Sequence, residues 1–188
     1  MNYPNGIKKE HKPSPITYRN RGMSLESDLN ESNEYYREID KAYIYKKPTP
    51  VKIVKVNYPS RDKAVIKEAY YTIPSTTDYN GLYKGKYIDF EAKETKNKTA
   101  FPLANIHSHQ IKHIKNIYNH QGIVFIIVRF THTNETFLLP GETFLNFLAQ
   151  EKRKSIPYSF FQKNAYLIKD GYKPRIDYLS VVDKLMEV

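Results

Sequence analysis

Hydrophobic and polar positions follow one another along the chain in two rhythms, one typical of helices and one of strands. Apolar residues recur at roughly helical spacing between residues 22 and 40, at Met23, Leu25, Leu29 and Tyr36. Strands are expected at about 42–45, 51–56, 64–73, 86–95, 123–130, 135–139 and 166–168. Further helices are expected at about 107–120, 140–150 and 178–186. This order of elements predicts one α/β domain over residues 21–188, with a central mixed β-sheet flanked by helices.

A long β-hairpin is predicted early in the chain. The β-rich segments 51–56 and 64–73 flank a turn at 57–62 that contains Asn, Pro, Ser and Asp. Cations lie along this hairpin and just before it, at Lys46, Lys52, Lys55, Arg61, Lys63 and Lys67. A hairpin with many cations and few core residues is expected to project as a stalk over residues 46–73. The same lysines would also suit an ordinary solvated edge that they protect from aggregation.

A second hairpin follows, with Gly81 and Gly85 in its turn region and its far strand at 86–95. Alternate residues of a strand share a face. One face of the far strand packs on the core and carries Ile88, Phe90 and Ala92. The other face carries Asp89, Glu91 and Lys93. Such a cluster of charges on one face of a strand requires a physical reason.

A metal ion supplies that reason. Asp78 precedes the turn and is expected to approach Glu91 across the hairpin, and two neighbouring carboxylates repel unless a proton or a cation intervenes. Mg²⁺ suits such a site because it takes carboxylate, water and phosphate oxygens, and the chain has no thiolates to attract a softer metal. Lys93 could then orient an attacking water or neutralise charge on phosphorus. Asp89 is interpreted either as a carboxylate behind the metal ligands or as a solvated residue.

The composition favours a polyanionic partner. The 188 residues include 30 Lys and Arg against 20 acidic residues, for a net charge of +10, together with 17 tyrosines. Positive charge attracts the phosphate backbone, and aromatic rings stack on bases. Residues 1–20 contain three prolines and four cations but no periodic apolar positions, and they are expected to form a flexible basic arm.

Several other kinds of site are excluded. Without cysteine the chain has no disulfides, thiolate nucleophiles or cysteine-based zinc sites. It has no Walker loop, no G-x-G-x-x-G motif and no nucleophile elbow. His109 and His113 stand one helical turn apart, but no third ligand at a suitable spacing supports a zinc site. Because neither a signal peptide nor a membrane-spanning apolar stretch is recognised, we expect a cytoplasmic protein without membrane association.

Four motifs together resemble a known family. They are Arg21-Gly22-Met23-Ser24-Leu25-Glu26, Thr76-Thr77-Asp78-Tyr79-Asn80-Gly81, Ile88-Asp89-Phe90-Glu91-Ala92-Lys93-Glu94-Thr95 and His109-Gln110. An Asp followed by Glu-x-Lys on the far strand of a hairpin resembles the PD-(D/E)xK nucleases. The wider set resembles the RecU family of Holliday-junction resolvases over nearly the whole chain. Thr77 replaces the superfamily's proline before Asp78, at a position that varies across the superfamily.

The resemblance implies a restriction-endonuclease-like fold and a homodimeric, Mg²⁺-dependent endonuclease, in which Mn²⁺ could substitute. Such an enzyme resolves Holliday junctions by paired symmetric nicks in homologous recombination and DNA repair. The resemblance also implies that the stalk enters the open centre of a four-way junction, with Arg61 at its tip. Other recombination proteins are further candidate partners.

For the site, the resemblance implies that Asp78 and Glu91 bind the metal and that Lys93 stabilises the transition state. Thr76 and Gln110 match two further positions associated with the metal, and Glu26 matches the acidic residue of the first helix. Without the resemblance, Gln110 would be interpreted as a buried side chain bonded to backbone. Thr76 would be a strand-end hydroxyl and Glu26 a solvated helix residue.

Two other functions stay open from the residues alone. One is a restriction-type or repair nuclease of the same superfamily, which would cut a four-way junction and a linear duplex at equal rates. The other is a non-catalytic basic DNA- or RNA-binding module, which would not cut in Mg²⁺ or Mn²⁺. A second Glu-x-Lys triplet, from Glu94 to Lys96, falls on the opposite face of the strand and is interpreted as surface.

Overall fold

The computed structural model describes residues 24–72 and 76–187. The predicted arm at residues 1–20 lies outside the described residues. The first element is helix α1 (Leu25–Glu38), which begins after the N-cap Ser24, whose side chain accepts a hydrogen bond from the Ser27 N–H. Glu26 and Asp28 lie in its first turn, where negative charge complements the helix dipole. The predicted helix at 22–40 is thus confirmed with slightly narrower bounds.

A six-stranded mixed sheet forms the centre of the molecule, in the order β1-β4-β5-β7-β8-β10. Its strands are β1 (Tyr43–Lys46), β4 (Tyr79–Tyr83), β5 (Lys86–Thr95), β7 (Ile123–Phe130), β8 (Glu135–Pro140) and β10 (Tyr166–Ile168). Strands β5 and β7 run parallel, and the other neighbours are antiparallel. Seven residues of β7 are buried, as its continuous apolar run requires in a strand covered on both faces.

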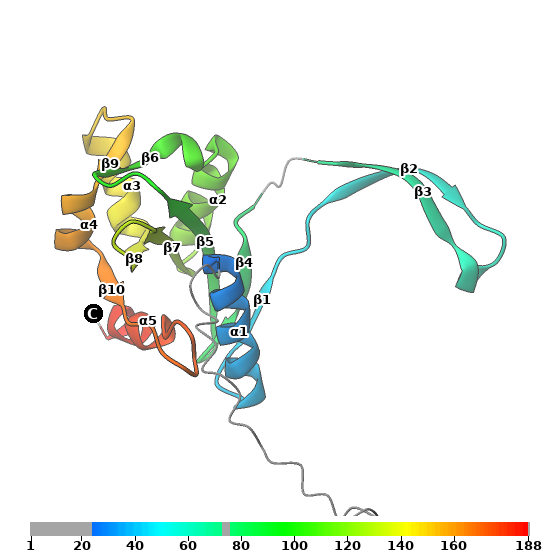
Figure 1. Cartoon of the computed structure of the whole chain (residues 1–188), viewed down its shortest axis with the longest axis horizontal. Coiled ribbons are helices and arrows are strands. Elements are labelled where there is room, and N and C mark those ends of the chain that lie inside the picture. Colours follow the sequence, from blue (N-terminus) through cyan, green and yellow to red (C-terminus); the bar gives the residue numbers. More distant parts are fainter. Residues whose placement is uncertain (1–23, 73–75, 188) are drawn as a thin grey trace, which may run out of the picture.

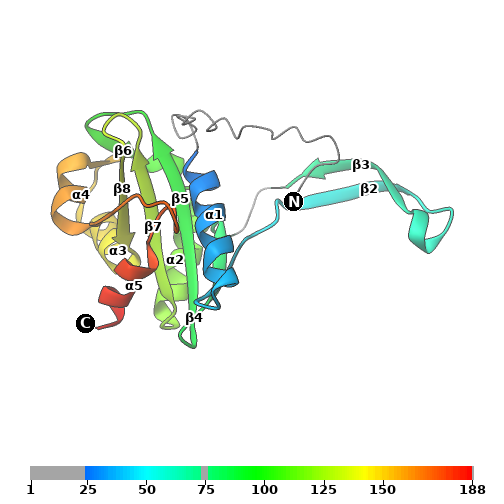
Figure 2. The same cartoon turned by 60° about the horizontal axis from the view of Figure 1, so that its bottom comes forward.

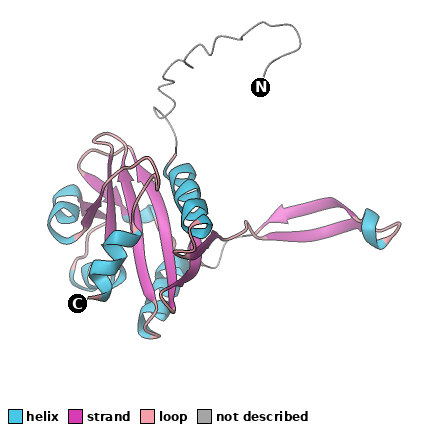
Figure 3. Ribbon diagram, turned by 90° about the horizontal axis from the view of Figure 1, so that it is seen from below, coloured by secondary structure: helices cyan, strands magenta, loops and turns pink. Residues whose placement is uncertain are grey.

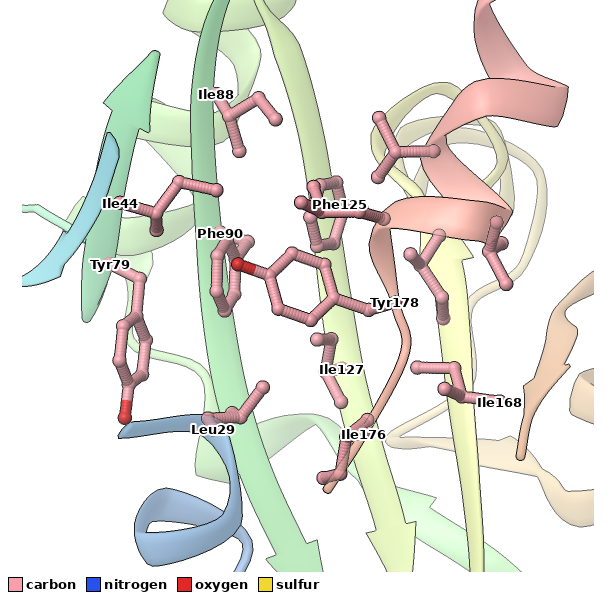
Figure 4. Close-up of a cluster of buried hydrophobic side chains, with 14 of the residues drawn as sticks. Leu29, Ile44, Tyr79, Ile88, Phe90, Phe125, Ile127, Ile168, Ile176 and Tyr178 are labelled. Atoms are coloured by element: carbon pink, nitrogen blue, oxygen red, sulfur yellow. The ribbon is translucent and has the colours of Figure 1, made fainter. Parts of the chain in front are cut away.

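Helices cover both faces of this sheet (Figure 2). On one face lie α1 and α5 (Leu179–Met186), and on the other α2 (Ser108–Asn119) and α3 (Gly141–Gln150). The α1 side is filled by aromatic rings, with Tyr178 lying 5.1 Å from Phe90 and 6.0 Å from Phe125 between ring centroids (Figure 4). The predicted α/β architecture, a mixed sheet flanked by helices, is confirmed.

Smaller elements that the hydrophobic pattern did not predict complete the fold. Strands β6 (Ala100–Pro102) and β9 (Ser155–Pro157) pair antiparallel, and helix α4 (Tyr158–Asn164) follows. A short 3₁₀ turn, η2 (Leu103–Asn105), leads towards α2. The strands β6 and β9 and the turn η2 have three residues each, which is too short for a periodic pattern to be recognised, and α4 spans only about two helical turns.

The predicted stalk is a separate two-stranded sheet that projects from the body (Figures 1 and 3). Its strands β2 (Val51–Asn57) and β3 (Val65–Tyr71) pair with each other, and a 3₁₀ turn, η1 (Arg61–Lys63), lies at the tip. Every residue of both strands is exposed. The expected projecting hairpin is confirmed, and we call β2, η1 and β3 the stalk from here on.

One expectation about the second hairpin was wrong. Gly81 does not lie in the turn but inside β4, where it pairs with Ile44 on one side and Ile88 on the other. The turn itself is Lys84–Gly85, and both residues have positive φ, of 48° and 75°. Two such residues form the tight turn whose twist matches paired strands. Gly81 is needed instead because β1 approaches it too closely for a side chain.

Among the helices described between Ser24 and Glu187, none is long and apolar enough to cross a bilayer.

Replacing Gly81 with alanine should lower the free energy of unfolding by about 3 kcal/mol or more. The added Cβ would lie 2.1 Å from the Tyr43 carbonyl oxygen and 2.6 Å from the Ile44 Cα, and these backbone atoms of β1 cannot move aside without shifting the strand. Gly85→Ala is the matched control, since only its positive φ is strained and it should cost about 1 to 2 kcal/mol. Urea unfolding measures both variants. Equal urea midpoints for Gly81→Ala and Gly85→Ala would contradict the close packing of β1 on β4.

Candidate active site

The β4–β5 hairpin brings the candidate carboxylates together. Its register pairs Tyr79 with Phe90, so one step further the ladder places Asp78 beside Glu91. Phe90 is fully buried on the α1 side, stacked on Tyr79 and Phe125 at 4.8 Å each. Because side chains alternate, Asp89, Glu91 and Lys93 face the α2 side. The apolar half of the strand thereby fixes the orientation of the charged half.

Asp78, Glu91 and Lys93 converge at one point. The Lys93 ammonium makes an ion pair with Glu91 Oε1 and lies 3.9 Å from Asp78 Oδ2. Glu91 has no exposed side-chain surface, whereas the side chains of Asp78 and Lys93 are 35% and 26% exposed. One carboxylate is therefore sealed in the protein while its two neighbours remain open to a substrate.

The pKa of Glu91 reflects this environment. Burial above all, and then the negative charge of Asp78, raise this pKa from the ordinary 4.5 to about 7, against the opposing effect of Lys93. Its Oε2 atom is buried and has no hydrogen-bond partner among the described residues. A buried carboxylate oxygen in this state is stabilised either by a proton or by a cation.

These residues fit a divalent cation. In residues 24–72 and 76–187, no group of three or more His, Cys, Asp and Glu side chains is arranged to hold a metal. Mg²⁺, however, is commonly bound through one or two carboxylates, with water and substrate phosphates completing its shell. The pair Asp78 and Glu91, with the unsatisfied Glu91 Oε2, meets that requirement. A site that kept three or four protein ligands, as zinc does, would not fit.

Gln110 and Thr76 lie next to these carboxylates in different ways. The Gln110 side-chain amide donates to Glu91 Oε1 at 2.7 Å, and its oxygen accepts from the His107 N–H at 2.9 Å. Gln110 therefore ties the start of α2 to Glu91. Thr76, Asp78 and Lys47 share the lining of a hollow of about 320 Å³ at the base of the stalk. The predicted association of Gln110 and Thr76 with the metal stays a prediction.

Glu26 lies at the N-terminal end of α1, near the same end of the sheet. Its side chain is 57% exposed and pairs with Lys46, and the Tyr79 hydroxyl donates to its backbone oxygen at 3.4 Å. Glu94, interpreted as surface, is exposed but has a structural partner, since its Oε1 accepts the Leu25 N–H at 2.7 Å. Glu94 thus fixes the start of α1, and with it Glu26, to strand β5.

Except for Lys46, which pairs with Glu26, the predicted DNA-contacting cations lie on the stalk, away from the carboxylates. Lys46 ends β1 at the body, while the remaining lysines lie exposed on the stalk, at Lys52, Lys55, Lys63 and Lys67. Arg61 belongs to η1 at the stalk tip. The structure therefore separates the candidate site into a carboxylate centre on the sheet and a basic arm that reaches beyond it.

A group that the sequence did not single out surrounds Asp89. This residue is fully buried, and its carboxylate contacts the hydroxyls of Thr77 and Tyr87, the Lys47 ammonium and the His113 ring. We call these five residues the Asp89 cluster. The alternation of β5 placed Asp89 on the face of Glu91, but Lys47 belongs to no periodic pattern and gave no signal. His113, considered as half of a zinc site, pairs with Asp89 instead.

Comparison with known proteins decides the family. The family model described as Recombination protein U (RecU) matches residues 20–184. This chain belongs to the RecU family. Relatives named Holliday junction resolvase RecU include one from Oceanobacillus iheyensis, 55% identical over 98% of this chain and 99% of its own length. Those of Geobacillus sp. and Staphylococcus aureus are 56% and 54% identical, over 95% and 99% of this chain and 90% and 96% of their own.

One solved structure of a Holliday junction resolvase is far less similar to this chain. Archaeoglobus fulgidus Hjc, a Holliday junction resolvase from an archaeal hyperthermophile, is 7% identical, with a TM-score of 0.39 over 71% of this chain and 93% of that chain. Likeness at this level supports no conclusion. Membership of RecU, by contrast, confirms the predicted resemblance, and it implies a nuclease that depends on a divalent metal.

The raised pKa of Glu91 predicts how the stability of the metal-free protein responds to pH. Between about pH 4.5 and 7 the folded state binds a proton that the unfolded state releases, so the free energy of unfolding falls as pH rises through this window. By pH 8 the loss should be on the order of 1 to 3 kcal/mol. Glu91→Gln cannot release a proton and should lack this fall.

Thermal unfolding of both proteins in EDTA from pH 4.5 to 8 measures the difference. Mg²⁺ added at pH 8 should then stabilise the wild type more than Glu91→Gln, because a ligand stabilises the state that binds it. Parallel pH curves for the two proteins would contradict the raised pKa.

Proposed function

We propose that this protein is a Mg²⁺-dependent endonuclease that resolves Holliday junctions in homologous recombination and DNA repair. Membership of the RecU family, and identities of 54 to 56% to relatives with that name, support the activity. The observation that carries it is the convergence of Asp78, Glu91 and Lys93 on one face of β5. A purely binding module has no need for two carboxylates held together in a partly buried site, since repulsion between them costs stability.

Within this proposal, Asp78 and Glu91 hold the cation, with Thr76 and Gln110 beside them. Mg²⁺ is the ion proposed because the donors are oxygens and the chain has no cysteine, and Mn²⁺ can replace it on the same grounds. When bound, such a cation supplies Lewis acidity at the scissile phosphate and lowers the pKa of a coordinated water.

The chain's own residues orient the reaction around that centre. Lys93 is open to the substrate and already paired with Glu91, so its ammonium is positioned to stabilise negative charge that develops on the phosphate. Gln110 orients Glu91 through its hydrogen bond to Oε1. Glu26 forms the edge of the site and holds Lys46 where the chain leaves the sheet for the stalk.

A homodimer is part of the proposal. Two symmetric nicks on opposed strands need two identical centres, which a two-fold dimer supplies. The stalk supports such association: a lone two-stranded hairpin is marginally stable in water, yet this one exposes Ile53, Val54, Val65 and Ile66, each about half accessible. A second copy of the stalk would cover this apolar surface.

The stalk cations extend the proposed DNA surface beyond the metal centre. Lys52, Lys55, Lys63 and Lys67 are exposed on an arm that projects from the body, which suits contact with phosphates at the centre of a four-way junction. Arg61 and Lys46 would contribute at its tip and base. We also place the protein in the cytoplasm, where the chromosomal substrate lies, together with other recombination proteins.

Asp78→Asn should lower the rate of junction cleavage by at least about 10²-fold, because it removes a metal-binding charge while keeping the shape of the side chain. Binding to a synthetic four-way junction in EDTA should be no weaker than that of the wild type. Cleavage in Mg²⁺ and a gel-shift titration measure the two quantities. A linear duplex of the same sequence is the substrate control. Equal cutting of junction and duplex by the wild type would exclude a resolvase, and no cutting in Mg²⁺ or Mn²⁺ would exclude a nuclease.

Changing Lys55, Lys63 and Lys67 together to Gln should weaken junction binding and flatten its salt dependence. Each lost phosphate contact reduces the slope of log affinity against log salt by about 0.9, so the slope should fall by up to about 3. Gel-shift titrations between low and moderate salt give the slope. Gln at Lys152, Lys163 and Lys184, three exposed lysines outside the stalk, is the matched control. The same slope for both triple variants would argue against a DNA-contacting stalk.

A further inference from the structure

The Asp89 cluster lies one alternation step from the metal-binding carboxylates, and its chemistry differs from theirs. Asp89 has no exposed surface, and burying a carboxylate is costly unless it is paired and hydrogen-bonded. Its Oδ2 lies 2.7 Å from the Lys47 ammonium, 2.9 Å from the Tyr87 hydroxyl and 3.2 Å from His113 Nε2. Its Oδ1 accepts the hydroxyl of Thr77. Both oxygens are therefore occupied, in contrast to the unsatisfied Oε2 of Glu91, so Asp89 is not arranged as a metal ligand.

Lys47 connects this buried carboxylate to the strand that carries Asp78. Its ammonium donates to the Thr77 hydroxyl at 3.0 Å as well as to Asp89, and its backbone N–H donates to the backbone carbonyl oxygen of Asp78 at 2.8 Å. Thr77 is itself buried. Lys47 therefore holds the backbone of Asp78, and Asp89 holds the side chain of Thr77, the residue before it.

Lys47, Thr77 and Asp78 lie where the two connecting segments of the stalk, one leaving β1 and one entering β4, meet the body. We call these segments the two legs of the stalk. The β1–β4 ladder ends at the pair Lys46–Tyr79, and Lys47 is the first residue of the leg towards β2. Thr76 to Asp78 end the returning leg before β4 begins. Where the strand ladder stops, the contacts of Lys47 and Asp89 continue the connection between the two legs. The hollow lined by Lys47, Thr77 and Asp78 lies at this base of the stalk.

We propose that Lys47 and Asp89 are positioning residues for DNA cleavage, which hold Asp78 opposite Glu91 and fix the base of the stalk to the metal-binding strand. This inference rests on the proposed function, since it concerns the same centre. Lys47 and Asp89 touch neither metal nor substrate and act through Thr77 and Asp78. Their loss should alter the geometry of the carboxylate pair without removing any group that binds DNA or metal.

The test variant is the double replacement Lys47→Met/Asp89→Leu. Removing Lys47 alone would leave a buried charge without its cation, whereas replacing both members by apolar residues of similar size often preserves stability. Lys47→Arg is the conservative variant, because it keeps a cation and several donors near Asp89 and Thr77. Lys84→Met is the matched control, since it removes an exposed lysine from its ion pair with Asp183 at the far end of the β4–β5 hairpin.

Three quantities are measured for each protein: junction affinity in EDTA, kcat for junction cleavage, and the Mg²⁺ concentration for half-maximal thermal stabilisation. The double variant should bind the junction as the wild type does, with kcat lowered about 10- to 100-fold and the half-maximal Mg²⁺ concentration raised about 10-fold. Lys47→Arg and Lys84→Met should stay close to the wild type in all three. If the double variant does not unfold cooperatively, Lys47→Gln/Asp89→Asn is used in its place, and the same three quantities are measured for it.

A double variant that is folded, with wild-type kcat and wild-type Mg²⁺ response, would overturn the proposal and leave the cluster a purely structural pair. The Mg²⁺ titration by thermal unfolding does not depend on cleavage. If the wild type cuts no DNA, the proposed function fails, while a weaker Mg²⁺ response of the double variant still supports the positioning of Asp78.

Discussion

The repulsion between two carboxylates brought together out of water is the constraint around which this molecule is organised. Glu91 is sealed beneath the surface with Asp78 at its side, and the ammonium of Lys93 offsets their charge only in part, since the pKa of Glu91 still rises to about 7. A fold tolerates such a pair only if other interactions hold it. Here the stacked rings of Tyr79, Phe90 and Phe125 on the opposite face of the sheet provide that support. Aromatic packing on the α1 side of the sheet therefore offsets the repulsion between the two carboxylates on the α2 side.

Much of this arrangement could be predicted from the order of residues. Strand β5 alternates so regularly that its charged and apolar faces follow from period two alone, and the continuous apolar run of β7 marks the strand beside it. The convergence of Asp78 with Glu91 required only a hairpin, and the resemblance to RecU supplied the expected roles. The stalk hairpin itself could be predicted from two β-rich segments around a turn, but the residues alone left a projecting stalk and an ordinary solvated edge equally open, because its strands mix lysines with Val and Ile.

What could not be predicted depends on contacts between segments with no shared pattern. Lys47 is one lysine among many, and only the folded chain shows that it lies against Asp89, 42 residues away. Gly81 was assigned to a turn because glycine is common there, whereas its actual role is to admit the backbone of β1. The strands β6 and β9 have three residues each and pair with each other across more than 50 residues, so no local pattern reveals the pairing. In each case the decisive information is the identity of a distant neighbour.

The stalk forms a sheet of its own, separate from the sheet that carries the carboxylates, and this separation has a consequence for substitutions along it. Strands β2 and β3 are exposed throughout and pair in a sheet of their own, so substitutions along them leave the packing around the carboxylates undisturbed. The length and charge of the stalk can therefore change without loss of the fold that holds the carboxylates. The carboxylate pair is held by the β4–β5 hairpin of the central sheet, so its geometry does not depend on which residues the stalk strands carry.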